Sequence, residues 1–194
     1  RFMLPCDAAT RASQNKGNMI GTELKGKTLG IIGTGSIGLR VAEIGKAFGM
    51  DIIAYSRSEK QAALDMGIRY VALDTLMAES DFVSVNCPLN ASTKGLINKE
   101  AIAKMKPTAC LINTARGPVV DSQALADALN NDAIRGAGID VFEVEPPIAG
   151  DHPLLNAKNV ILAPHVGFAT KEALITRAEI AFDNITTWLK GERI

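Results

Sequence analysis

The stretch KTLGIIGTGSIG, residues 27–38, decides the fold of this chain. A short apolar run leads into glycines at the spacing G-x-G-x-x-G, and a helical pattern follows. In such a unit the first glycine permits a tight turn, the second lets the backbone approach a pyrophosphate, and the third lets the helix pack on the strand. These glycines are Gly33, Gly35 and Gly38. The backbone N–H groups of Ser36 and Ile37 would lie at the positive end of the helix. The stretch predicts a dinucleotide site; a glycine-rich turn that binds nothing is the alternative.

Outward from this stretch, short apolar runs alternate with helical patterns. The runs are almost continuously apolar, as expected of strands buried on both faces of a parallel sheet. They lie at residues 27–33, 51–55, 81–86, 109–114, 134–141 and 159–165. This alternation predicts an α/β fold, a doubly wound parallel sheet of the Rossmann type with helices on both faces. Residues 1–27 stand apart as polar, and NKGN (15–18) and GTELKGK (21–27) within them are predicted to form loops.

Helices are predicted where apolar residues recur one turn apart. The first helix follows the glycines and carries Ile37, Val41, Ile44 and Phe48. A second begins at Asp121, a favourable N-cap residue, and carries Leu125 and Leu129. The last follows Thr170 and carries a stripe of Leu174, Ala178, Ala181, Ile185 and Trp188.

Composition limits the classes of function. Lys+Arg and Asp+Glu balance at 21 each, so nucleic acid is not an expected partner. There is no long apolar run typical of a signal peptide or a membrane span. Three cysteines and the absence of a CxxC spacing suit a reducing compartment, so the expected location is the cytoplasm. The two histidines lie far apart, and no metal site is expected.

The segment DIIAYSRSEK, residues 51–60, bears on the choice of cofactor. Ser56 stands where an acid would bind the 2′-hydroxyl of the NAD adenosine ribose. A carboxylate there would also repel a 2′-phosphate, whereas Ser56 does not, and Arg57 with Ser58 could bind it. The segment therefore favours NADP over NAD. The alternative is that Arg57 is a solvated surface residue and NAD is still accepted.

Charged residues follow three later strands: Arg116, then Asp140 and Glu145, then His165. Because the carboxyl ends of parallel strands share one edge of the sheet, these side chains are expected to converge. The fork of Arg116 suits a carboxylate. Glu145 would orient the imidazole of His165 and favour its protonated form. Together they suit hydride transfer to a 2-keto acid: Arg116 holds the carboxylate and polarises the carbonyl, His165 donates the proton, and the cofactor donates the hydride.

Each of these residues has a plain alternative when taken alone. Arg116 could cap a surface turn, Glu145 could be a solvated loop acid, and His165 could be a core histidine. Their placement after three successive strands favours the catalytic interpretation. His152, which precedes Pro153 in a loop, is interpreted as structural.

The chain resembles the nucleotide-binding domain of the D-isomer-specific 2-hydroxyacid dehydrogenases. The likeness runs from about residue 21 to the end and rests on GTELKGKTLGIIGTGSIG, VNCPLNASTKGLIN, LINTARGPVVD, GAGIDVFEVEPP and APHVGFAT. The resemblance implies that Arg116, Glu145 and His165 are the catalytic residues. It also implies cofactor contacts from Ser36, Ile37, Cys87, Pro88, Thr93, Thr114, Ala115, Arg116, Asp140, His165 and Gly167, with Asp140 near the nicotinamide.

The chain departs from the family pattern in two ways. The usual acid after the second strand is replaced by SRS, as in members that use NADP. The N-terminal substrate-binding portion is missing, so we expect a truncated form or a proteolytic fragment with little activity of its own. The expected parts are residues 1–21, a remnant of the helix and linker to that portion; 22–170, the dinucleotide-binding domain; and 171–194, a helix returning towards the missing portion.

The expected function is an NAD(P)-dependent oxidoreductase domain acting on a small 2-keto or D-2-hydroxy acid, dimerising through this domain as family members do. The alternative is a non-catalytic, cofactor-sensing and dimerising protein, like the corepressors that resemble the same family. A short-chain dehydrogenase is set aside because that class needs Tyr-x-x-x-Lys, and neither Tyr55 nor Tyr70 has a lysine four residues later.

Overall fold

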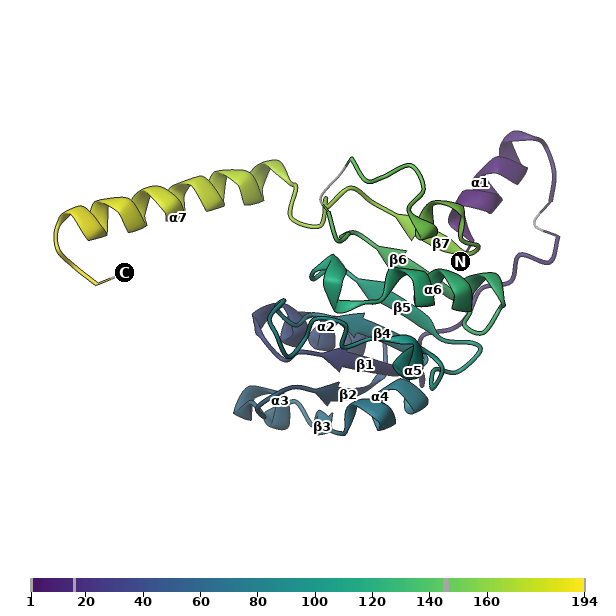
Figure 1. Ribbon diagram of the computed structural model, residues 1–194, viewed down its shortest axis with the longest axis horizontal. Helices are drawn as coiled ribbons and strands as arrows, with labels where there is room; N and C mark the ends of the chain where they lie inside the picture. Colours follow the sequence, from purple (N-terminus) through teal and green to yellow (C-terminus); the bar gives the residue numbers. More distant parts are fainter. Residues whose placement is uncertain (1, 16, 145–146, 194) are drawn as a thin grey trace.

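The computed structural model describes residues 2–15, 17–144 and 147–193. At its centre lies a seven-stranded parallel sheet with the strand order β3-β2-β1-β4-β5-β6-β7 (Figure 1). The strands are β1 (Thr28–Ile32), β2 (Asp51–Tyr55), β3 (Arg69–Tyr70), β4 (Phe82–Val85), β5 (Cys110–Asn113), β6 (Gly136–Ile139) and β7 (Val160–Leu162). All six predicted strands are present, and β3 was not predicted. The order reverses at β1, where doubly wound sheets open a crevice for ligands.

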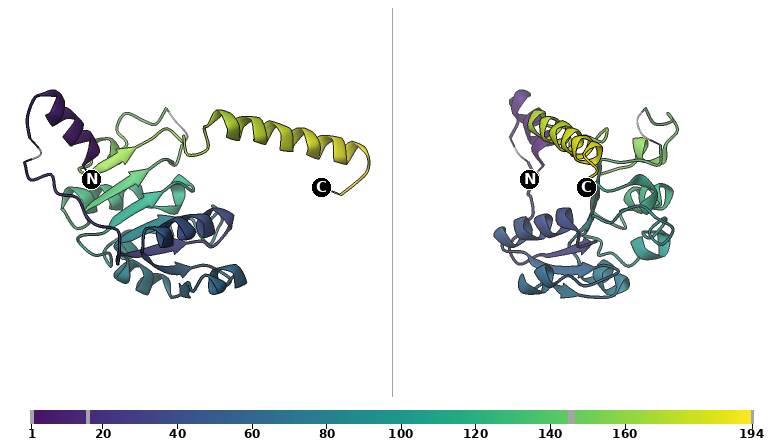
Figure 2. Two further views of the ribbon diagram at one scale, coloured as in Figure 1. Left: turned by 180° about the vertical axis from the view of Figure 1, so that it is seen from behind. Right: turned by 90° about the vertical axis from the view of Figure 1, so that its left-hand side faces the viewer.

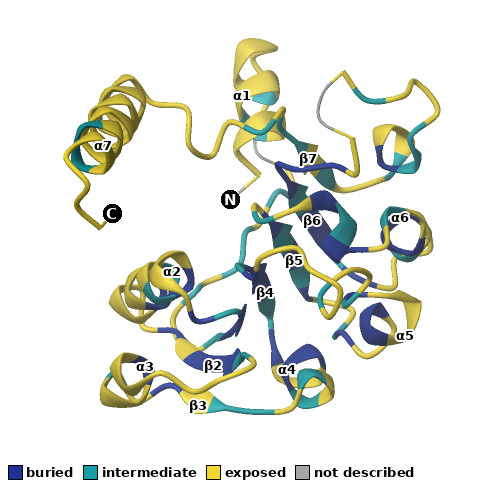
Figure 3. Ribbon diagram, turned by 60° about the vertical axis from the view of Figure 1, so that its left-hand side comes forward, coloured by how far each residue is buried: buried dark blue, intermediate teal, exposed yellow. Residues whose placement is uncertain are grey.

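Helices cover both faces of the sheet, as predicted. The helices α2 and α3 lie on one face, and α4, α5 and α6 lie on the other (Figure 3). The helices are α1 (Met3–Arg11), α2 (Ser36–Ala47), α3 (Gln61–Asp65), α4 (Leu73–Glu79), α5 (Lys99–Ile102), η1 (Gly117–Val119), α6 (Ser122–Asn130), η2 (Pro153–Asn156) and α7 (Lys171–Leu189). The doubly wound Rossmann sheet is therefore the fold that the sequence predicted.

The core consists of two apolar clusters, one on each face of the sheet. Ile31 belongs to the cluster beneath α2 and α3, and its neighbour Ile32 belongs to the cluster beneath α4, α5 and α6. Both side chains are at most 1% exposed. This alternation follows from the pleat of the strand, and it explains why the strand sequences are apolar at nearly every position.

Helix α2 packs on the sheet through its small residues. A Cβ at Gly38 would overlap the carbonyl oxygen of Gly33, and one at Gly45 would lie 2.7 Å from Leu29 Cδ2. Because the backbone lies this close, the larger residues of the predicted stripe point outwards, and Ile44 is 50% exposed. The helix was predicted correctly, but its buried face is the one of glycine and alanine.

Two helices begin at the N-cap residues from which the sequence predicted them to start. The carboxylate of Asp121 accepts the N–H of Ala124 at 3.0 Å at the start of α6. The hydroxyl of Thr170 accepts the N–H of Ala173 at 3.1 Å at the start of α7. These bonds satisfy N–H groups that have no partner within the helix.

The two ends of the chain form helices that lie outside the sheet and bury none of their residues. The polar segment 1–27 begins with a helix, α1 (Met3–Arg11), and its residues 21–27 form no helix or strand, as predicted. This helix buries no residue and so shows no apolar stripe; an ion pair of 2.9 Å between Asp7 and Arg11 links its successive turns. Helix α7 extends away from the sheet and also buries no residue (Figures 1 and 2).

Within the described ranges, no helix has both the length and the apolar character needed to cross a membrane.

Candidate active site

A cavity of about 890 Å3 lies at the carboxyl edge of the sheet. Six residues predicted from the sequence line it: Ile37, Thr114, Arg116, Asp140, His165 and Gly167. These residues come from the start of α2 and from the ends of β5, β6 and β7. The cavity therefore joins the glycine loop to the segments predicted to perform chemistry. Three residues that were not predicted complete its lining: Pro164, Phe168 and Arg177.

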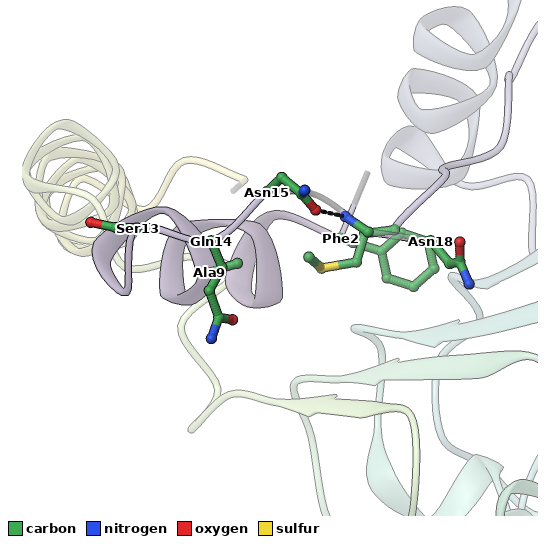
Figure 4. A pocket seen from close by; sticks show the side chains of 8 residues that line it. Phe2, Ala9, Ser13, Gln14, Asn15 and Asn18 are labelled. Atoms are coloured by element: carbon green, nitrogen blue, oxygen red, sulfur yellow. Dashed lines mark hydrogen bonds between the residues drawn. The ribbon is translucent and has the colours of Figure 1, made fainter.

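A second hollow, of about 770 Å3, is formed by α1 and the segment after it (Figure 4). Asn15 Oδ1 accepts the N–H of Gly17 at 3.0 Å on its rim. None of its eight lining residues carries a charged or catalytic side chain. The first cavity is the candidate active site.

The glycine loop has the shape that a pyrophosphate needs. Gly33 has φ 98°, and a Cβ there would lie 2.8 Å from the backbone nitrogen of Cys87. Gly35 caps α2 with φ −72° and ψ −175°, and no atom lies within 4 Å of the position of its missing Cβ. No side chain caps this helix, so the N–H groups of Ser36 and Ile37 are available to an anion. These features fit the phosphates of a dinucleotide.

The segment predicted to read the adenosine ribose begins beside this loop. Gly33 donates its N–H to the carbonyl oxygen of Tyr55 at 2.8 Å, so Ser56 follows directly at the same edge. Ser56 is half-buried, while Arg57 and Ser58 are exposed. Ser56 therefore starts next to the glycine loop, and the exposed Arg57 and Ser58 follow it along the chain.

Three of the predicted cofactor contacts, Cys87, Pro88 and Thr93, lie in the segment after β4. Cys87 is 7% exposed, and burial raises the pKa of its thiol, which keeps it protonated. The Thr93 hydroxyl donates to the carbonyl oxygen of Pro88 at 2.6 Å and accepts the N–H of Asn90 at 2.9 Å. Thr93 thus stabilises its own loop, whose cofactor contacts remain a prediction.

After β5, a buried asparagine shapes the turn that presents Arg116. Asn113 is 1% exposed, donates to the carbonyl oxygen of Arg116 at 3.0 Å and accepts the N–H of Ala115 at 3.1 Å. The next residue, Gly117, packs against the backbone of Phe142 so closely that a Cβ would overlap it. The backbone is fixed on both sides of Arg116, while its side chain is exposed towards the cavity.

Asp140 holds the segment that carries His165. Its carboxylate accepts the N–H groups of Val166 and Gly167, each at 2.8 Å, and its carbonyl oxygen accepts the N–H of His165 at 2.8 Å. His165 has φ 56°, a left-handed conformation that is uncommon for a residue other than glycine. Such outliers cluster at functional sites, where surrounding contacts maintain them. The ring of Phe168 meets the His165 ring edge to face, with 5.6 Å between centroids.

Glu145 lies outside the described residues, but its neighbours are placed. His152 Nδ1 accepts the N–H of Leu154 at 3.3 Å, so its Nε2 carries the proton that bonds Glu143 at 3.0 Å. Burial raises the pKa of Glu143, but hydrogen bonds from Ser122 and His152 outweigh burial and lower it overall. His152 therefore has a structural contact, as the sequence indicated. Among the described residues, no group of three or more His, Cys, Asp or Glu could hold a metal ion.

Known proteins match this geometry over nearly the whole chain. Residues 1–167 match the model of the D-isomer specific 2-hydroxyacid dehydrogenase, NAD binding domain. The chain belongs to this family. The family that the sequence motifs resembled is therefore confirmed.

Individual known proteins show how much of the chain is shared. The glyoxylate reductase of Aeropyrum pernix is 48% identical over 175 residues, which cover 90% of this chain and 52% of that protein. The apo-structure of D-lactate dehydrogenase from Escherichia coli aligns with a TM-score of 0.87 and 36% identity, covering 100% of this chain and 61% of that one. An acyclic imino acid reductase in complex with NADPH and D-Arg aligns with a TM-score of 0.89 and 33% identity, covering 100% and 62%. The chain spans about half the length of the curated relatives it matches.

Proposed function

We propose that this dehydrogenase domain binds a nicotinamide dinucleotide and supports hydride transfer between that cofactor and a small 2-keto or D-2-hydroxy acid. The observation that carries the proposal is the cavity in which Ile37 of the glycine-loop helix meets Arg116, Asp140 and His165. A nicotinamide dinucleotide bound at the glycine loop would supply or accept the hydride.

The side chains of the cavity have distinct proposed roles. The planar fork of Arg116 binds the substrate carboxylate with two parallel hydrogen bonds and draws electron density from the adjacent carbonyl. His165 donates a proton to the carbonyl oxygen as the hydride arrives at the carbonyl carbon, and takes a proton back in the reverse direction. Asp140 acts through the backbone, because its carboxylate fixes the N–H groups of Val166 and Gly167. Glu145 is proposed to orient the imidazole.

The proposed cofactor is NADP in preference to NAD. Ser56, Arg57 and Ser58 carry no negative charge where an acid would repel a 2′-phosphate, and the guanidinium of Arg57 can form charge-assisted bonds with it. One structural relative, the imino acid reductase, is described in complex with NADPH.

We also propose that the domain forms a homodimer. Large apolar side chains on α7 and at the end of α2 face solvent, among them Phe182 at 71%, Trp188 at 66% and Phe48, which follows α2, at 59% exposure. An exposed apolar surface of this extent is typical of an interface. Residues 171–194, which include α7, are proposed to return from the dinucleotide-binding unit 22–170 towards a substrate portion, and residues 1–21 to connect the unit to that portion. The cytoplasm stays the expected location, and its reducing conditions suit three cysteines that form no disulfide.

The test is turnover by the protein at its full natural length. NADPH oxidation is followed with glyoxylate or hydroxypyruvate in the wild type and in His165→Ala. Losing the proton donor should lower kcat by about 100-fold or more, while NADPH binding stays close to that of the wild type. Near wild-type turnover in His165→Ala would refute the proposed mechanism. A wild type that binds NADPH but reduces no 2-keto acid would favour a non-catalytic binding protein.

A further inference from the structure

Arg177 on α7 is a second arginine in the candidate active site. Its guanidinium carbon lies 5.4 Å from the centroid of the Phe168 ring. The same ring meets His165 edge to face, with an angle of 88° between the ring planes. Arg177 is therefore connected through one aromatic ring to the proposed proton donor, and all three residues line the cavity.

The charges of the cavity leave the two arginines available to a ligand. Asp140 supplies the negative charge of the lining, but it is 6% exposed and its two carboxylate oxygens each accept a backbone N–H. Among the described residues, neither Arg116 nor Arg177 forms a salt bridge. A guanidinium that stacks on an aromatic face keeps its in-plane N–H donors for a carboxylate. Phe168 thus holds Arg177 without using its hydrogen bonds.

The proposed function uses only one of the two arginines. The proposed function assigns the carboxylate beside the keto group to Arg116, since it lies next to the carbonyl that accepts hydride. The cavity of about 890 Å3 lies within the usual range for small-molecule sites. Two cations on one cavity indicate a ligand with two anionic groups.

We propose that Phe168 and Arg177 form a second anion subsite, which selects 2-keto acids with another carboxylate at the far end of the carbon chain. The substrate class is thus the 2-keto dicarboxylates. This inference rests on the proposed function and refines it, because it names the substrate that the Arg116 and His165 site would reduce.

The test compares two substrates that differ in one carboxylate. These are 2-oxopentanedioate and 2-oxopentanoate, used with NADPH and the protein at its full natural length. The wild type should show a kcat/KM for the diacid about tenfold or more above that for the monoacid, the effect expected of a charge-assisted hydrogen bond. Arg177→Met, which keeps the length of the side chain and removes its charge, should reduce this ratio about tenfold.

The matched control is Lys171→Met on the same helix. Lys171 is exposed and outside the cavity lining, so its loss removes the same charge without touching the subsite, and the ratio should stay that of the wild type. NADPH affinity, measured for every variant, reports whether the fold is intact. An unchanged ratio in Arg177→Met, or a wild type with no preference for the diacid, would overturn the subsite. Absence of turnover with glyoxylate and with both acids would overturn the proposed function itself.

Discussion

The hydroxyl of Tyr70 on β3 donates a hydrogen bond of 2.9 Å to Thr34 Oγ1 in the glycine loop. The same Tyr70 oxygen accepts the N–H of Lys60 at 3.0 Å, at the end of the segment that carries Arg57 and Ser58. Thr34 is 2% exposed, so its partner cannot readily be replaced by water. One hydroxyl therefore connects the loop proposed to bind pyrophosphate with the segment proposed to bind the ribose.

Tyr70→Phe should separate these two segments. It removes two hydrogen bonds and leaves a buried threonine oxygen without a donor, which should lower the free energy of unfolding by about 1–2 kcal/mol. NADPH should bind several-fold more weakly, because the ribose segment is no longer held beside the glycine loop. Urea unfolding of the 194-residue chain measures the free energy of unfolding, and fluorescence titration measures the NADPH affinity. The control is Tyr55→Phe, whose hydroxyl has no hydrogen bond among the described residues. Equal effects of the two substitutions on NADPH affinity would contradict the connecting role of Tyr70.

Gly35→Ala should affect binding without affecting folding. The backbone angles of Gly35 suit any residue, and no protein atom lies within 4 Å of the added Cβ. That open space is where we propose the pyrophosphate approaches the backbone, so NADPH affinity should fall about tenfold or more. The melting temperature should stay within a degree or two. Gly150→Ala is the control, since its Cβ is equally free of contacts in another loop. Unchanged NADPH affinity in Gly35→Ala would place the cofactor elsewhere.

Asp81 gives the fold a dependence on pH that can be measured. Burial raises the pKa of Asp81, but the N–H of Thr28, the ammonium group of Lys106 and the charge of Lys27 together lower it below its ordinary value of 3.8. Thr28 N lies 2.9 Å and Lys106 Nζ 3.2 Å from the carboxylate. Because the folded-state pKa is the lower one, the stabilisation is complete above the unfolded pKa and is lost as pH falls through the folded one.

Asp81→Asn should therefore destabilise the domain at pH 7 and less so in acid. The loss at neutral pH should be about 1 kcal/mol, below the usual range for a hydrogen bond to a charged group, because Lys106 is partly exposed. Below pH 4 the variant and the wild type should converge. Urea unfolding across this range tests the claim. The exposed Asp183→Asn on α7 should change stability by less than about 0.5 kcal/mol at any pH. A deficit in Asp81→Asn that persists unchanged into acid would mean that the charge of Asp81 does not stabilise the fold.

The sheet could be predicted from the sequence because strands buried on both faces are apolar at nearly every position. The pair Ile31 and Ile32 is an example, since the two side chains serve opposite clusters. Strand β3 escaped prediction because it has two residues at the edge of the sheet, one of them exposed. Its contact with the glycine loop joins residues 36 positions apart, Tyr70 and Thr34, and no local pattern signals such a contact.

The candidate site was predictable only where its residues follow strands. Arg116, Asp140 and His165 each come after an apolar run, and parallel strands bring their ends to one edge. Arg177 was missed because its position depends on the direction of α7, which no strand fixes. The clue that could have found Arg177 is its charge beside Leu174 and Ala178, on a face that otherwise reads as apolar.

The last prediction concerns the cofactor and the double change Ser56→Asp with Arg57→Ala. In the wild type a 2′-phosphate should gain charge-assisted bonds from Arg57 and Ser56, each worth about 1.5–3 kcal/mol, with exposure at the ribose edge favouring the lower value. NADPH should therefore bind about tenfold more tightly than NADH. In the double variant the carboxylate repels the phosphate and accepts bonds from the ribose hydroxyls, so the order should reverse. Titrations of the wild type and the double variant with NADPH and with NADH measure the four affinities. Arg69→Ala is the control, because Arg69 is paired with Glu79 at 2.6 Å and lies on the edge strand. If the wild type prefers NADH, Arg57 is only a surface arginine and the missing acid does not select for the phosphate.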